Sequence, residues 1–208
     1  SSAASDVYKR QDHQLGRLLD ALDDSPMKDN TIIVLWSDHG FHIGEKQNWE
    51  KFALWDQTTR VPFFVHAPGV SRDGATTRQP TTLTDIYPTL CELAGLPVPE
   101  LCTGVSLVSQ LKNPNAPRDR MALTAFQFWN EKTPSLAVAD SRYRFIRYGD
   151  GFEELYDLEK DPHEFKNLIA DPRLAKVKMR LANALPKKVT PIQKIPQDSP
   201  FHRGRKRN

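Results

Sequence analysis

An apolar run that passes directly into a polar loop constrains this chain more than any other feature. Residues 31–36 read Thr-Ile-Ile-Val-Leu-Trp, and residues 37–46 read Ser-Asp-His-Gly-Phe-His-Ile-Gly-Glu-Lys. The β-branched and large apolar residues predict a strand buried on both faces, as in a parallel sheet with helices on each side. Ligands of such sheets bind beyond the carboxyl ends of the strands, where Asp38 and His39 fall. The sequence therefore predicts a metal site or a catalytic pair at these two residues.

The composition fits a globular protein and excludes some functions. The 208 residues are 38% hydrophobic, and no apolar run approaches the roughly 20 residues of a membrane span. The net charge is +3, and 29 basic residues are spread among 26 acidic ones, so no field of one sign covers the chain. A basic tail at 202–207 is the exception. Short basic termini are usually solvated, so we expect no nucleic-acid partner. Because no apolar run is long enough, we also expect no membrane span.

The beginning of the chain differs in composition from the amphipathic segment after it. It reads Ser-Ser-Ala-Ala-Ser, without an initiator Met or a signal pattern. We therefore expect the chain to be a fragment in which residues 1–11 could be a non-native leader. Leucines at helical spacing then predict an amphipathic helix over 12–24, which stops before Pro26.

The first part of the chain continues with one more strand and one more helix. An apolar strand is expected over 61–66, and a helix over 85–95 with Pro88 in its first turn and Gly95 at its C-terminal cap. Cys91 lies in the apolar pattern of this helix and is expected to be a buried thiol. A bridge to Cys102 is the alternative, since two cysteines make neither a disulfide framework nor a metal cluster.

After Pro97 the pattern changes, and prolines mark a linker-like region. Short β-type runs separated by turn signals then predict an antiparallel meander; they lie at 122–128, 135–139, 143–148 and 154–158. A closing helix is expected over 171–185, capped by Asp171. The expected domains are a main α/β part over 12–118, a small α+β subdomain over 119–186 and an irregular basic tail over 187–208.

Ordered sequence blocks over residues 12–170 resemble one known family. The first three blocks read D-x-Q-x-G-R-L-L-D-A-L at 12–22, N-T-I-I-V-L-W-S-D-H-G at 30–40 and G-E-K-x-x-W-x-K at 44–51. They are followed by T-R-V-P with P-G, by D-I-Y-P-T-L, and by R-Y-x-x-I-R-Y with E-E-L-Y-D-L-x-x-D-P-x-E-x-x-N-L. With these residues the chain resembles the C-terminal part of a sulfatase of the alkaline phosphatase superfamily, closest to the iduronate-2-sulfatase-like branch found widely in bacteria.

The resemblance implies a fold and a missing partner. The implied fold is α/β: part of an alkaline phosphatase-like sandwich, followed by a small antiparallel β-sheet subdomain with a C-terminal helix. Sulfatases of this family carry, in their N-terminal half, a C/S-x-P-x-R motif whose first residue becomes formylglycine, and two metal-binding aspartates. Neither occurs here, so the missing N-terminal half is the expected partner, and this chain alone is not expected to turn over substrate. The family also implies a periplasmic or extracellular location.

The resemblance also assigns roles to residues of the polar loop. It implies that Asp38 is a ligand of a divalent cation, usually calcium, and that His39 is its partner ligand or contacts the sulfate. An imidazole suits calcium less well, so the pair alone would also fit zinc. Lys51 matches a lysine that binds the substrate sulfate, which makes Lys51 and His39 the catalytic candidates. Without the resemblance, these would be a turn aspartate, a loop-fixing histidine and a solvated lysine.

Neighbouring loop residues are weaker candidates. His42 and Phe41 are expected to contact the substrate beside Lys51, and Phe41 or Trp49 could pack against a sugar ring. Glu45 and Lys46 could line the same pocket, although loops need such groups for their own hydrogen bonds. Loop aromatic residues are more often buried anchors.

The sequence favours an enzyme fragment of a sulfatase acting on sulfated carbohydrate. Arg60 is expected to form a structural ion pair. Residues 129–131 are candidates for further substrate contacts that vary between specificities. One alternative is a phosphatase or phosphodiesterase of the same superfamily, with a Thr or Ser nucleophile and two zinc ions. Another is a non-catalytic fragment that binds sulfated glycans.

Overall fold

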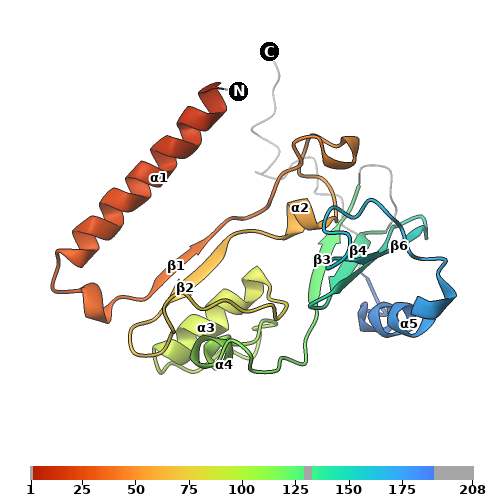
Figure 1. The fold of residues 1–208 in the computed structure, drawn as a ribbon. Coiled ribbons are helices and arrows are strands. Elements are labelled where there is room, and N and C mark those ends of the chain that lie inside the picture. Colours follow the sequence, from red (N-terminus) through yellow and green to blue (C-terminus); the bar gives the residue numbers. More distant parts are fainter. Residues whose placement is uncertain (1, 129–132, 190–208) are drawn as a thin grey trace, which may run out of the picture. The chain divides into compact units, whose positions relative to one another are not determined.

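The computed structural model describes residues 2–128 and 133–189 (Figure 1). These residues form two compact units that do not follow the chain in order. The first unit comprises the residues up to 37 together with 62–77 and 84–116, and the second comprises 38–61, 78–83 and the residues from 117 onward. The polar loop after the first strand therefore groups with the C-terminal part of the chain.

The first unit contains a two-stranded antiparallel sheet. Strand β1 (Ile33–Trp36) pairs with β2 (Phe63–His66), and Val34 lies opposite Val65. The expected parallel sheet with both faces buried is therefore wrong for the described residues, in which Leu35 and Trp36 are 39% and 49% exposed. An apolar sequence predicts a strand, but the elements packed around the strand decide how much of it is covered.

The helix before this sheet begins earlier than expected. Helix α1 (Ser2–Asp23) is continuous, so residues 2–11 extend the helix predicted for 12–24. Its apolar stripe is only partly covered, and Leu18 is 68% exposed. That residues 1–11 are a non-native leader stays a prediction, because a helical conformation does not reveal the origin of a sequence. No helix in the described part of the chain is long and apolar enough to cross a membrane.

Helices α3 (Ile86–Leu93) and α4 (Val108–Lys112) complete the first unit. Helix α3 confirms the predicted helix, and Gly95 has the positive φ of +67° that is typical of a C-terminal cap. Helix α4 was not expected, because the prolines around it indicate a linker. Side chains near the start of α3 hold this segment: Asp85 Oδ1 accepts from Val105 N at 2.8 Å, and Thr89 Oγ1 accepts from Leu107 N at 2.9 Å.

Both cysteines belong to the first unit. Cys91 in α3 is buried, Cys102 is half-buried, and both are free thiols. The buried thiol is confirmed, and the alternative of a bridge is wrong.

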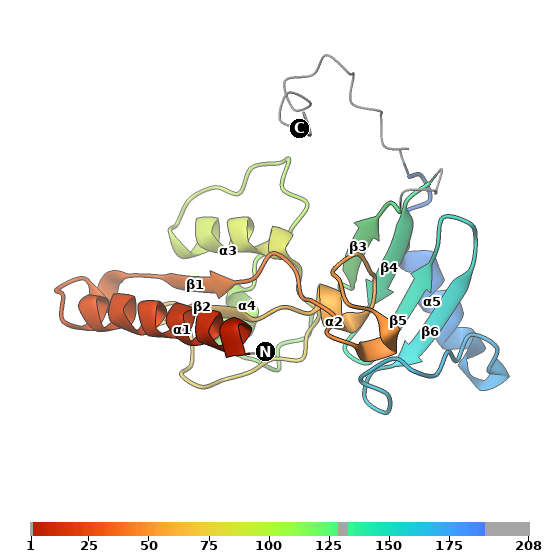
Figure 2. The ribbon, with the colours of Figure 1, turned by 90° about the horizontal axis from the view of Figure 1, so that it is seen from above.

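The second unit is built on a four-stranded antiparallel meander, as predicted. Its strands neighbour one another in chain order (Figure 2). They are β3 (Ala122–Phe126), β4 (Ser135–Ala139), β5 (Tyr143–Arg147) and β6 (Glu153–Asp157). Each begins and ends within two residues of its predicted bounds, because alternating apolar residues and turn signals are local features of the sequence.

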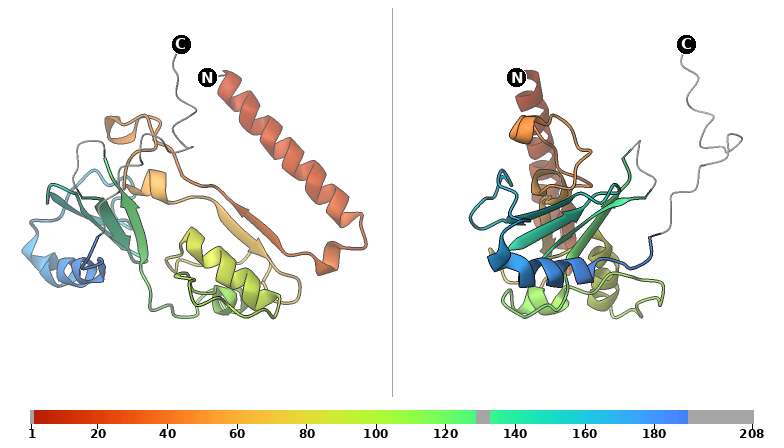
Figure 3. Two further views of the ribbon diagram at one scale, coloured as in Figure 1. Left: turned by 180° about the vertical axis from the view of Figure 1, so that it is seen from behind. Right: turned by 90° about the vertical axis from the view of Figure 1, so that its right-hand side faces the viewer.

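Helix α5 (Ala175–Ala184) covers one face of this sheet (Figure 3). The core on that face consists of Leu136, Val138, Phe145, Leu155, Leu181 and Leu185. As predicted, the chain before the helix is capped by Asp171, whose carboxylate accepts from Arg173 N at 2.9 Å. The described residues also contain four short 3-10 helices: η1 (Lys28–Asn30), η2 (Glu45–Gln47), η3 (Leu83–Asp85) and η4 (Pro172–Leu174).

The segment that follows the polar loop covers the other face of the sheet. Leu54, which is 1% exposed, packs there with Ala137, Ile146 and Tyr156, and Trp55 packs against the same cluster. Helix α2 (Asp56–Thr59) comes directly afterwards in the chain. The loop that carries the predicted site is thus anchored in the core of the C-terminal sheet.

Candidate active site

Asp38 opens the polar loop, and all of the predicted site residues lie in the second unit. The carboxylate of Asp38 is 84% exposed, and its Oδ1 accepts from the backbone N–H of His39 at 3.0 Å. Asp38 Oδ2 lies 3.7 Å from His39 Nε2. The hydrogen bond from the backbone therefore holds the carboxylate beside the imidazole.

The side chain of His39 has a defined orientation. Its Nδ1 lies 2.8 Å from Gly40 O, and since a carbonyl oxygen only accepts, Nδ1 carries the proton and Nε2 presents a lone pair. Lys51 Nζ lies 2.9 Å from this Nε2 and donates to it. Glycine is required at position 40, because a Cβ there would lie 2.0 Å from Gln57 O.

Asp38, His39 and Lys51 therefore converge at the surface of the second unit. The structure brings together a carboxylate, an imidazole nitrogen with a lone pair, and an ammonium group, all of which the sequence singled out. The ammonium attracts an anion, whereas the other two groups offer lone pairs to a cation. The roles of the three residues stay predictions at this point.

The donor atoms of Asp38 and His39 fit a shared divalent cation. Their separation of 3.7 Å allows both to reach one ion at about 2.4 Å, the usual calcium distance. Calcium takes about six to eight ligands, and residues 2–128 and 133–189 contain no group of three or more His, Cys, Asp or Glu that could hold a metal. The two residues therefore suit part of a metal site, and further donors must come from elsewhere.

The two predicted substrate contacts differ in exposure. Phe41 is 50% exposed, but His42 is 0% exposed, and its ring meets Trp55 edge-on at 5.6 Å. Burial lowers the pKa of His42, and Glu45, whose Oε2 lies 4.0 Å from His42 Nδ1, partly opposes this effect. A histidine in this position packs the inside of the loop, which counts against a direct contact with substrate.

The loop between His39 and Lys51 closes on itself. The backbone N–H of His42 donates to Glu50 O at 3.2 Å. At the apex, in η2, Lys46 and Gln47 have positive φ angles of 53° and 59°. This left-handed conformation costs a non-glycine residue roughly 1–2 kcal/mol, so contacts elsewhere must stabilise the apex.

The side chain of Lys46 supplies such contacts. Its Nζ donates to Tyr156 OH at 3.1 Å and to the backbone oxygen of Glu164. It also lies 4.4 Å from the ring centroid of Trp55 and 4.7 Å from that of Tyr156. Burial lowers the pKa of Lys46, and the nearby carboxylates of Glu154, Glu164 and Asp161 oppose this effect.

A buried ion network fixes the end of the loop, and sequence reasoning missed it. Arg144 on β5 lies 2.7 Å from Asp56 Oδ1 and 3.1 Å from Glu164 Oε1, and Asp56 N donates to Glu164 Oε2 at 2.6 Å. Burial raises the pKa of Glu164 to about 7, against the opposing effect of Arg144. Arg60 lies 2.6 Å from Asp56, which confirms the expected structural ion pair. An arginine inside an otherwise apolar strand is the signal that could have revealed the network.

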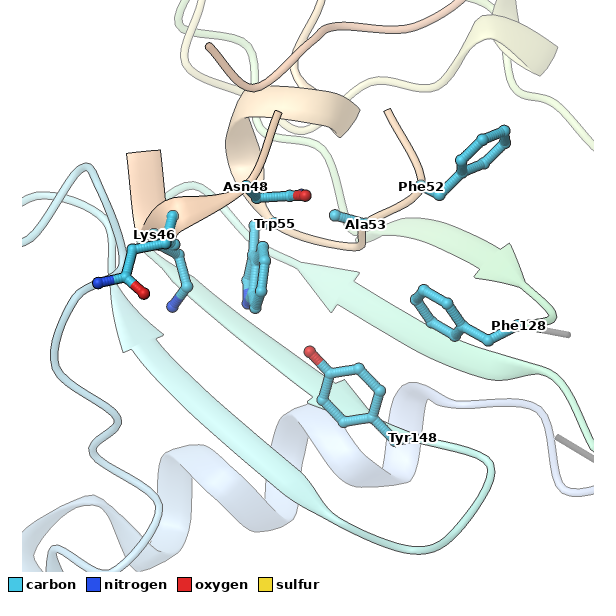
Figure 4. Close-up of a pocket in the computed structure, with 8 residues that line it drawn as sticks. Lys46, Asn48, Phe52, Ala53, Trp55, Phe128 and Tyr148 are labelled. Carbon is cyan, nitrogen blue, oxygen red and sulfur yellow. The ribbon is translucent and has the colours of Figure 1, made fainter. Parts of the chain in front are cut away.

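A pocket of about 320 Å³ lies between the loop and the end of the sheet (Figure 4). It is lined mainly by Lys46, Asn48, Phe52, Trp55, Phe128 and Tyr148. Glu154 orders two of its walls, since its Oε2 accepts from Trp55 Nε1 at 2.8 Å and from Tyr148 OH at 3.0 Å. The predicted substrate contacts at 129–131 lie outside the described residues.

Comparison with known proteins finds sulfatases among the similar sequences, and both sulfatases and phosphonate monoester hydrolases among the solved structures. A sulfatase of Formosa agariphila is 42% identical over 156 residues, which are 75% of this chain and 30% of that protein. A Delta 4,5-hexuronate-2-O-sulfatase of Bacteroides thetaiotaomicron is 34% identical over 175 residues, covering 79% of this chain and 36% of that protein. A solved structure of a protein with its substrate, D-glucosamine-2-N,6-O-disulfate, matches with a TM-score of 0.76 and 27% identity, over 83% of this chain and 36% of that one. A phosphonate monoester hydrolase of Agrobacterium radiobacter matches with a TM-score of 0.68 and 30% identity, over 83% of this chain and 37% of that one.

Residues 44–190 match the family described as N-sulphoglucosamine sulphohydrolase, C-terminal. The match covers more than half of the chain, which therefore belongs to this family. The predicted resemblance to the C-terminal part of a sulfatase, and to its alkaline phosphatase-like α/β fold, is confirmed. The chain spans about a third of the length of the relatives it matches.

Proposed function

We propose that this chain forms the C-terminal part of a sulfatase that hydrolyses sulfate esters of a sulfated carbohydrate. The observation that carries the proposal is the convergence of Asp38, His39 and Lys51, with Lys51 Nζ 2.9 Å from His39 Nε2. Membership of the family and the names of the relatives support the reaction class and the substrate class. The site is needed for the argument, because a fold alone does not define a function.

The chemistry of sulfate ester cleavage explains why these residue types are needed. The reaction requires a nucleophile at sulfur, positive charge near the sulfuryl oxygens and help for the leaving alcohol. Lys51 supplies a positive charge that binds the sulfate and stabilises charge in the transition state. The proton on Nδ1 leaves Nε2 of His39 with a lone pair, which accepts from Lys51 in this structure and becomes available to a cation once Lys51 turns to the sulfate. A hydrogen bond from His39 to the sulfate would instead require a proton on Nε2.

Asp38 and His39 are the residues that would hold a divalent cation, and calcium is the ion expected from the family. Such an ion, when bound, polarises a sulfate oxygen. The formylglycine nucleophile and the remaining metal ligands are expected from the N-terminal half of the full-length enzyme. Phe41 is exposed enough to pack against a sugar ring, whereas the buried His42 is left out of the proposal. The family favours a periplasmic or extracellular enzyme.

The test is Lys51→Ala in the full-length parent protein. Turnover of a sulfated sugar should fall by on the order of 100-fold or more, because a donor aimed at transition-state charge is lost. Lys160→Ala, which removes an exposed lysine after β6, is the control and should leave turnover unchanged. The melting temperatures of both variants are also measured, and they distinguish a loss of catalysis from a loss of folding.

Two outcomes would count against the proposal. Near-normal turnover by Lys51→Ala would show that Lys51 is not a sulfate ligand. A parent enzyme that cleaves phosphate esters but not sulfate esters would favour the phosphatase alternative.

A further inference from the structure

Lys46 differs from the neighbouring Lys51 in that its ammonium is held against the C-terminal sheet. Its Nζ donates to Tyr156 OH on β6 and to the backbone oxygen of Glu164. The ring centroids of Trp55 and Tyr156 lie 4.4 Å and 4.7 Å from the same nitrogen. An ammonium with these partners is not available as a second sulfate ligand, so its role must be of another kind.

The backbone at Lys46 needs this anchor. Lys46 and Gln47 form the apex of the loop with φ angles of 53° and 59°, a conformation that non-glycine residues rarely adopt and that persists only where the surroundings enforce it. The side chain of Lys46 ties this apex to β6 through Tyr156.

The apex is connected to both halves of the candidate site. His42 N donates to Glu50 O at 3.2 Å, so the loop is closed at its base. His39 lies three residues before this closure, and Lys51 comes directly after it. The conformation of the loop therefore determines whether Lys51 Nζ reaches His39 Nε2, which it does at 2.9 Å.

We propose that Lys46 is a positioning residue of the Asp38, His39 and Lys51 site: it fixes the apex of the loop to β6 and so places the Lys51 ammonium beside His39. The proposal rests on the proposed function, in that Lys51 is taken to be the sulfate ligand. Lys46 itself does not touch the substrate.

The first experiment uses the 208-residue chain and requires no activity. NMR measures the proximity of the His39 ring to the Lys51 side chain, together with the nitrogen shifts that report the His39 tautomer. Lys46→Met keeps the length of the side chain but removes the charge and the donors, and it should weaken or abolish this contact. Lys160→Met, the matched control, should preserve it. An unchanged contact in a folded Lys46→Met variant would overturn the proposal.

The second experiment is a double-mutant cycle in the full-length parent. Lys46→Met should lower kcat/KM about tenfold on its own, mainly through kcat, but less than twofold in a Lys51→Ala background, because residues that act through one group are not additive. A merely structural role would give the same loss in both backgrounds and would overturn the proposal. Should Lys51→Ala alone keep normal turnover, the proposed function of Lys51 fails, while the NMR contact still decides the role of Lys46.

A milder variant covers the case in which Lys46→Met does not fold. Tyr156→Phe keeps the buried ring and removes only the hydroxyl that accepts from Lys46 Nζ. It should weaken the contact between His39 and Lys51 in the same direction by a smaller amount. A Tyr156→Phe variant indistinguishable from wild type in both measurements would contradict the anchor.

Discussion

The two sheets of this chain contain similarly apolar strands but differ in what covers them. The sheet β3–β6 has α5 on one face and Leu54 on the other, and Phe145 and Ile146 are both 0% exposed. In the sheet β1–β2, Trp36 is 49% and Phe64 is 61% exposed. The difference teaches that the second unit contains its own core, whereas the first unit presents apolar surface of the kind that normally packs against another element.

The largest effect is expected from Phe145→Ala on β5. The side chain is fully buried among Leu136, Leu155 and Leu181, so removing the ring should destabilise the second unit by about 3–5 kcal/mol. Amide hydrogen exchange in β4–β6 of the 208-residue chain measures this loss. A loss below about 1 kcal/mol would mean that the sheet is not the independent core that its burial indicates.

The next effect concerns the face of the same sheet that carries the loop. Arg144→Met leaves Glu164 buried without its arginine and Asp56 paired only with the exposed Arg60, and should cost about 3 kcal/mol. This cost lies at the lower end of the roughly 3–5 kcal/mol that is usual for breaking a buried ion pair, because Glu164 can take up a proton when Arg144 is lost. Urea unfolding at neutral pH measures it. Arg173→Met is the control, since Arg173 pairs with Asp171 at an 87% exposed position and its loss should change stability far less; equal losses would contradict a buried network.

These contacts also mark the limit of what the sequence predicts. The meander, α3 and α5 follow from periodicity, turn residues and caps that lie within a few positions of one another. The convergence of Asp38, His39 and Lys51 was anticipated through a family motif. The pairing of Arg144 with Asp56 and the contact of Lys46 with Glu164 join residues 88 and 118 positions apart, and no local pattern encodes such partners. The exposure of β1 in the described residues differs from the prediction for the same reason, because the elements that cover a strand are not encoded in its own sequence.

A smaller effect is expected from pH, through Glu164. The pKa of its carboxyl group is about 7 in the folded chain, above the ordinary value of 4.5. The folded state therefore binds this proton more tightly than the unfolded state, so the stability that the proton contributes is complete below about pH 4.5 and is lost as the pH rises through 7. Glu164→Gln, which cannot ionise, should remove this loss, on the order of 1–3 kcal/mol.

The measurement compares the urea unfolding of Glu164→Gln and wild type at pH 5 and pH 8. The comparison with wild type is necessary because the lowered pKa of His42 contributes a trend of opposite sign. The charged groups that face Glu164, namely Arg144, Asp56 and Lys46, are present in both proteins. Parallel pH profiles would show that the carboxyl group is already ionised at pH 5.

The smallest effect is expected at the exposed sheet, and it sharpens the comparison most directly. Phe64 lies opposite Leu35 across β1–β2, and Phe64→Ala in the 208-residue chain should cost less than about 1 kcal/mol, the usual value of a cross-strand pair. In the full-length parent the same change should cost about 3 kcal/mol or more, because we expect the N-terminal half to cover this face. Phe165→Ala, at a residue that is 66% exposed in the second unit, is the control and should cost little in both proteins. A small loss for Phe64→Ala in the parent would show that this face stays open, and a large loss in the 208-residue chain would show that the first unit already packs it.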